Sequence, residues 1–117
     1  MINLRLKDIN SSKFKKSIEI QSFTSGSNKE DIPIDILKES ISKKTWAIPA
    51  TSVALRRQEF HQAQGINIKK CIEFVIRFMQ IDISYKVVFK DEVYEIKGIE
   101  NVELADKYLV LVTERVS

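Results

Sequence analysis

The stretch that decides the fold is Lys70-Cys71-Ile72-Glu73-Phe74-Val75-Ile76-Arg77-Phe78-Met79, just past the middle of the chain. Every second residue from Ile72 to Phe78 is large and apolar, whereas the residues between them are mixed in character. A period of two is typical of a β-strand whose side chains alternate between two faces. The pattern predicts a strand with one face in the core and the other partly wet.

Weaker period-two patterns lie on both sides of this stretch. They predict strands at residues 17–23, 45–48 and 107–116, and a hairpin over 87–96 that turns near Lys90 and Asp91. Residues 54–64 contain good helix formers without Gly or Pro, which predicts one short helix. Ser52 is the candidate cap, Gly65 follows the helix end, and Leu55, Glu59 and Phe60 form a narrow stripe expected to lie on the sheet.

These elements predict a mainly β protein: a small β-barrel or sandwich of about six strands with one short helix. Residues 24–44 are polar and show no clear period, so we expect a long, flexible polar loop there; a short helical turn within 35–42 is the alternative. The length of 117 residues fits one domain spanning residues 1–117.

Composition excludes several classes of protein. One cysteine, Cys71, rules out a disulfide within the chain, and no apolar run approaches the roughly 20 residues of a membrane helix. The start of the chain lacks the apolar core of a secretory signal. The net charge of +3 is mildly basic. A small basic β-barrel that binds nucleic acid without catalysis therefore stays open as an alternative function.

The residue types needed for catalysis are sparse. His61 is the one histidine and has no evident partner, and one Cys with one His does not make a structural zinc site. The three glycines do not form a phosphate-binding loop. Cys71 fits a half-buried apolar position better than a nucleophile. We therefore expect no enzyme activity, no metal and no cofactor.

Several segments, taken in order, resemble the bacteriophage head–tail joining family, also called head-closure, stopper or head–tail adaptor proteins. The similar segments are Ile2-Asn3-Leu4-Arg5-Leu6-Lys7-Asp8, Thr45-Trp46-Ala47-Ile48-Pro49, Arg57-Gln58-Glu59-Phe60-His61-Gln62-Ala63-Gln64, Val75-Ile76-Arg77-Phe78, Phe89-Lys90-Asp91-Glu92-Val93-Tyr94-Glu95-Ile96 and the closing Tyr108-Leu109-Val110-Leu111-Val112-Thr113-Glu114. The resemblance covers about residues 1–23 and 45–116. Glu92 stands where the family often has Gly, and residues 24–44 match no family pattern.

The resemblance implies a structural virion protein. Such proteins form a ring, usually dodecameric, that docks below the portal after packaging, closes the head, retains the DNA and offers a surface for tail attachment. The implied partners are portal or adaptor proteins, tail completion proteins and packaged DNA in the channel, with no membrane. The implied location is the virion, and the host cytoplasm during assembly, where the isolated chain is often a monomer.

Two groups of residues are candidates for contacts in such a ring. Lysines in or near the expected loop are candidates for facing the channel or DNA, the alternative being a solvated loop: Lys29, Lys38, Lys43 and Lys44. Residues of the expected helix are candidates for contacts with a neighbouring subunit or the portal, the alternative being a helix that only covers an end of the barrel: Arg56, Arg57, Glu59, Phe60 and His61.

Overall fold

The alternating stretch forms β3 (Cys71–Arg77) in the computed structural model, which describes residues 4–116. Phe74 and Ile76 are fully buried, as their spacing predicts. Phe78 is not in the core: β3 ends at Arg77, and the Phe78 side chain is 37% exposed beyond it. The strand therefore ends one apolar residue earlier than its pattern suggests.

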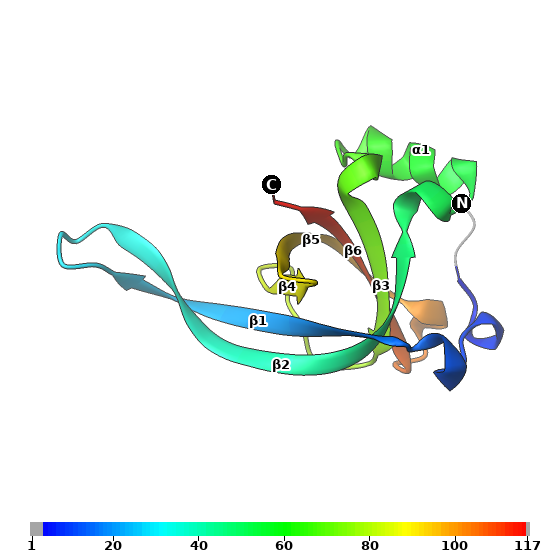
Figure 1. Cartoon of the computed structure of the whole chain (residues 1–117), viewed down its shortest axis with the longest axis horizontal. Helices are drawn as coiled ribbons and strands as arrows, with labels where there is room; N and C mark the ends of the chain where they lie inside the picture. Colours follow the sequence, from blue (N-terminus) through cyan, green and yellow to red (C-terminus); the bar gives the residue numbers. More distant parts are fainter. Residues whose placement is uncertain (1–3, 117) are drawn as a thin grey trace.

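Six antiparallel strands close into a barrel (Figure 1). They are β1 (Lys16–Ser27), β2 (Pro33–Pro49), β3, β4 (Lys86–Phe89), β5 (Glu92–Asn101) and β6 (Tyr108–Arg115). Their order around the barrel is β1-β2-β3-β6-β5-β4, and the pairing of β1 with β4 closes it. Short 3-10 turns lie at Leu6–Asp8, Ser11–Lys13, Ala50–Ser52, Ile68–Lys70 and Val102–Leu104. The predicted mainly β barrel with one helix is confirmed.

The inside of the barrel is an apolar core with buried residues from β1, β3, β4, β5 and β6, and Ala47 of β2 packs against it. Phe74 lies at its centre, where its ring meets those of Phe89 and Tyr94 edge-on, with centroids 5.2 and 5.7 Å apart. Ile18 and Ile20 of β1 fill the side that the closing pair covers. Edge-to-face rings of this kind add to the free energy gained by burying their area.

A second apolar cluster lies outside the barrel wall. On the other face of β3, Cys71, Glu73 and Val75 are buried and only Arg77 at its end is exposed, so the face expected to be partly wet is covered over most of its length. The N-terminal segment, the 3-10 turns and the single helix α1 (Leu55–Ala63) form a layer over this face. The pattern of one strand does not report that layer, because its residues come from elsewhere in the chain.

The two ends of helix α1 are capped in different ways. At its start Ala54 is the cap residue, and the Ser52 hydroxyl instead donates to the Pro49 carbonyl, so the predicted Ser52 cap is wrong. At its end Gly65 has a φ of 81°, the left-handed conformation that terminates helices, as predicted.

In the described part of the chain, no helix is long and apolar enough to cross a membrane.

The largest correction concerns residues 24–44, which are not a loop. They form the outer parts of β1 and β2, a twisted two-stranded hairpin that projects from the barrel on the left of Figure 1. Alternation was hidden there because a register shift between Ser22 and Phe23 of β1, opposite Glu39 and Leu37 of β2, makes Lys38 an extra residue.

The β4–β5 hairpin turns at Lys90 and Asp91, which have φ values of 50° and 64°. Two consecutive left-handed residues are the mark of a type I′ turn, in which the second position favours Gly. An L-residue in this conformation costs roughly 1–2 kcal/mol relative to glycine. The chain therefore makes the expected hairpin with an unfavourable residue at its tightest point.

We predict that Asp91→Gly stabilises the fold by about 1 kcal/mol, because glycine relieves the left-handed strain. Urea unfolding followed by circular dichroism measures the change as a higher midpoint. Glu92→Gly is the matched control: Glu92 lies in extended β5, where glycine should lower the midpoint. A lower midpoint for Asp91→Gly would contradict this account of the turn.

Candidate functional site

Much of β1 and β2 does not belong to the barrel and forms the projecting hairpin instead. β1 pairs with β4 only through Glu19, Ile20 and Gln21, and β2 pairs with β3 only through Trp46–Pro49. The rest of each strand pairs with the other alone. Within residues 4–116, both outer edges of the hairpin therefore carry backbone groups without a neighbouring strand, which makes them templates for strand pairing with another chain.

The tip of the hairpin is a defined turn. The Asn28 side-chain oxygen accepts hydrogen bonds from the amides of Glu30 and Ile32, at 2.8 and 3.0 Å. The Asn28 amide in turn donates to the Ile32 carbonyl. Asparagine suits this position because its short amide reaches backbone groups two residues on. The tip is thus held by local bonds and does not depend on the barrel.

An apolar stripe runs along one face of the hairpin. Residues that are paired across two strands point to the same face of the sheet. Because Lys38 is an extra residue, a different set of β2 positions points to this face beyond the bulge. Ile41 is opposite Ile20 of the barrel core, and beyond the bulge Ile36 and Ile34 take up the same face. These three isoleucines are 40%, 45% and 41% exposed. The barrel's inner face therefore continues outward as an uncovered apolar surface.

The candidate lysines do not form one patch. Lys29 lies in the exposed tip turn, Lys38 at the bulge, and Lys43 and Lys44 near the barrel. The strand between Pro33 and Lys44 spans about 36 Å at 3.3 Å per residue, so the tip lysine is far from the other end. Lys43 is half-buried and the other three are exposed. The hairpin carries these cations along its length without gathering them.

Helix α1 is held to the barrel by a buried ionic network. Arg57 Nε donates to both carboxylate oxygens of Glu73 on β3, at 2.9 and 2.7 Å, and its Nη2 donates to Glu100 on β5 at 2.9 Å. His61 Nε2 lies 2.7 Å from Glu73 Oε2. The side chains of Arg57, His61 and Glu73 are at most 7% exposed. One turn of helix thus places two nitrogen donors over one buried carboxylate.

The electrostatics of the network favour its charged form. Burial by itself lowers the pKa of the Arg57 guanidinium, but hydrogen bonds to Glu73 and Glu100 outweigh burial, so the pKa lies above its ordinary value. Burial, followed by the nearby charge of Glu73, raises the pKa of the Cys71 thiol to about 12. Cys71 is therefore a neutral, buried thiol at neutral pH, which matches its predicted structural role.

This network corrects two candidate contact residues. Arg57 and His61 were expected on an interface, but their side chains point inward and are engaged by β3 and β5. Arg56, Glu59 and Phe60 do lie on the outer surface of α1. The expected apolar stripe does not pack on the sheet, because Leu55 is 68% and Phe60 41% exposed. The helix is attached through its polar face.

Glu73 and Glu100 were missed by the sequence reasoning. A signal for Glu73 was present: a carboxylate within a run of apolar strand residues must be paired if it is buried. The four-residue spacing of Arg57 and His61 on a helix was the matching signal, since such residues share one face. Glu100 is part exposed and lies between the predicted hairpin at 87–96 and the predicted strand at 107–116, so it carried no comparable signal.

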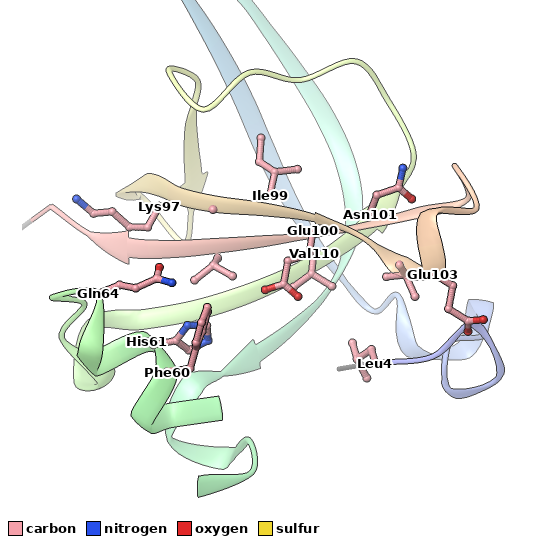
Figure 2. Close-up of a pocket in the computed structure, with 13 residues that line it drawn as sticks. Leu4, Phe60, His61, Gln64, Lys97, Ile99, Glu100, Asn101, Glu103 and Val110 are labelled. Atoms are coloured by element: carbon pink, nitrogen blue, oxygen red, sulfur yellow. The ribbon is translucent and has the colours of Figure 1, made fainter. Parts of the chain in front are cut away.

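A groove of about 420 Å³ lies beside α1. Figure 2 shows Phe60 and His61 of the helix on one wall, Glu100 and Asn101 of β5 opposite, and Leu4 at one end. Two of its polar lining residues belong to the network and are already engaged: His61 by Glu73, and Glu100 by Arg57. Among the described residues, no cluster of three His, Cys, Asp or Glu side chains is arranged to hold a metal ion.

We predict that Arg57→Ala destabilises the fold by about 3–5 kcal/mol, because it leaves Glu73 buried without its cation. Urea unfolding measures this as a lower midpoint. The neighbouring Arg56→Ala removes the same charge from an exposed position and should change stability by no more than about 0.5 kcal/mol. Equal effects of the two substitutions would show that the network does not hold the helix.

The fold has a counterpart among solved structures. The chain is similar to the solution structure of protein SF1141 from Shigella flexneri 2a, with a TM-score of 0.68 and 11% sequence identity, covering 93% of this chain and 98% of that one. At this identity the likeness concerns the fold. No curated protein matches the chain.

Family membership comes from the sequence as a whole. The family model described as "Phage head completion protein" matches residues 9–116, which includes the barrel, α1 and the hairpin. The match agrees with the resemblance of the strand and helix segments to head–tail joining proteins. The chain belongs to the phage head completion protein family and has a structural role in phage head assembly.

Proposed function

We propose that copies of this chain form a ring at the head–tail interface, dock below the portal after packaging, retain the DNA and present a surface for tail attachment. Family membership supports the setting, in the virion and among other head and tail proteins. The observation that carries the proposal is the ordered hairpin with an apolar face exposed along Ile34, Ile36 and Ile41. A neighbouring subunit that covers this face removes its apolar side chains from water, which favours association.

The barrel and the hairpin have different roles in this proposal. The barrel is closed, with a filled core and a second layer on its wall, and acts as a rigid body. The hairpin reaches the neighbouring subunit, where its apolar face is covered. A two-stranded ribbon is marginally stable by itself, so contact with a third strand or another surface stabilises it.

The outer surface of α1 is the proposed contact with the adjoining head or tail protein. Arg56, Glu59 and Phe60 are exposed there, at the end of the barrel covered by the helix. Arginine and aromatic residues are enriched in protein interfaces. The buried Arg57–Glu73 pair keeps the helix in place, so this surface is presented in one orientation.

DNA retention in this proposal depends on closing the channel with protein, rather than on binding by the hairpin tip. Lys29 is accompanied at the tip by Glu30, Asp31 and Asp35, so the tip carries more negative than positive charge. Such a surface repels phosphate. Lys38, Lys43 and Lys44 stay the candidates for facing the channel, in a ring of about twelve subunits.

We predict that shortening the hairpin abolishes head completion without unfolding the barrel. In the variant, an Asn-Gly turn replaces residues 23–38 and joins Ser22 to Glu39, which are paired in the register. DNA-filled heads made without this protein are mixed with purified chain, and nuclease-resistant DNA and tail joining are measured. Wild type should restore both; the shortened chain should restore neither, because the arm is missing.

The control is Lys29→Ala, a single change at the tip that keeps the arm and should behave as wild type. Circular dichroism checks that the shortened barrel remains folded. Full activity of the shortened chain would contradict the proposed arm. Salt-sensitive binding of the isolated chain to DNA, with no effect on heads, would favour the alternative of a free-standing nucleic-acid-binding barrel.

A further inference from the structure

The two ends of the hairpin carry opposite charge. Three acidic residues lie at or next to the tip turn, with one lysine among them: Glu30, Asp31 and Asp35, with Lys29. At the barrel end, Lys13, Lys15 and Lys16 line one groove together with Trp46. None of the three acids or the three groove lysines forms an ion pair within residues 4–116. The two ends therefore carry net unpaired charge of opposite sign, negative at the tip and positive at the groove.

The groove has the features of a docking site. It measures about 350 Å³, and its residues come from the 3-10 turn at Ser11–Lys13, the start of β1 and the part of β2 near the barrel. Trp46 is half-buried, and the Lys13 ammonium lies 5.0 Å from the centre of its ring. A half-buried aromatic ring beside three lysines suits a partner that combines apolar side chains with carboxylates.

The hairpin cannot reach the groove of its own chain. Tip and groove are at opposite ends of β1, and the 11 residue steps from Lys16 to Ser27 span about 36 Å. The strand runs from one to the other without folding back (Figure 1). A surface and its complement at opposite ends of one extended arm meet only between two copies, head to tail. A head-to-tail contact of this kind closes into a ring when the rotation permits.

We propose that the hairpin arm docks on a second copy of this chain, with Glu30 and Asp31 of the tip turn against Lys15 and Lys16 of the neighbour's groove. Ile34 and Ile36 are then covered beside Trp46 of the neighbour, which removes the outer part of the apolar stripe from water. The charges set the partner and the direction of the contact, and the apolar face supplies the buried area. This inference rests on the ring proposed above and names the contact that builds it.

Charge reversal tests the pairing. The tip variant is Glu30→Lys/Asp31→Lys, and the groove variant is Lys15→Glu/Lys16→Glu; all four positions are exposed, so both variants should fold. Either variant alone places like charges in every contact between neighbours. We therefore expect it to give about tenfold fewer heads that retain DNA and join tails than wild type gives. An equimolar mixture restores every contact in an alternating ring, so the mixture should recover wild-type activity.

The matched control reverses two exposed carboxylates on β5, away from the hairpin and from α1, Glu92→Lys/Glu95→Lys, and should act as wild type. If either reversed variant alone acts as wild type, or if the mixture is no better than its parts, the tip-to-groove contact is overturned while the ring stands. If the wild-type chain itself fails to restore the heads, both the ring and this contact are overturned. The two failures are therefore distinguishable.

Cross-linking gives a second measurement that does not depend on charge reversal. In a Glu30→Cys/Lys15→Cys variant, a short bismaleimide should link neighbouring copies in completed heads into ladders of multiples of the chain mass. Cys71 gives a clean background, because it is buried and burial raises the pKa of its thiol to about 12. The matched Gln62→Cys/Lys15→Cys variant moves one thiol to α1 and should give no ladder. A ladder from both variants, or from neither, overturns the contact.

Discussion

The short pairing between β1 and β4 is the constraint on which the rest of this structure depends. Three residues of each strand close the barrel, Glu19–Gln21 against Lys86–Val88, and no more of β1 is used. Because β4 is so short, β1 and its partner β2 must leave the barrel beyond that point. The arm is therefore a direct consequence of closing a six-stranded barrel with strands of very unequal length.

Away from the hairpin, a buried ionic network holds helix α1 against the barrel, whereas apolar packing holds the inside of the barrel together. Helix α1 turns polar residues toward β3 and exposes Leu55 and Phe60. A paired buried charge contributes little net free energy compared with apolar packing, but it penalises every arrangement that breaks the pair. The network thus specifies the position of the helix, and with it the orientation of the surface that the helix presents.

The sequence predicts the barrel well because its core strands alternate, and alternation is a local property. Phe74 and Ile76 illustrate this success. The hairpin was missed for a physical reason: the extra residue Lys38 shifts the apolar positions from odd to even numbers, so Ile41 and Ile36 no longer fit one period.

The functional side chains were harder to predict for the same kind of reason. The residues that cover β3 lie far from it in sequence, and the partners of Arg57 are 16 and 43 residues away. The pattern around His61 shows that the helix has a polar face, but it does not show that this face is buried. Only the folded chain brings Glu73 and Glu100 to it.

Hydrogen exchange tests most directly the claim that the barrel is a rigid body carrying an arm completed by a neighbour. Backbone exchange is compared between the isolated chain and the chain in completed heads. The account predicts a gain in protection at residues 23–37 and 12–16, where arm and groove meet, and no change in β3 and β6, which are already buried in the free chain. Protection gained only at α1, with the arm exchanging equally in both states, would contradict it.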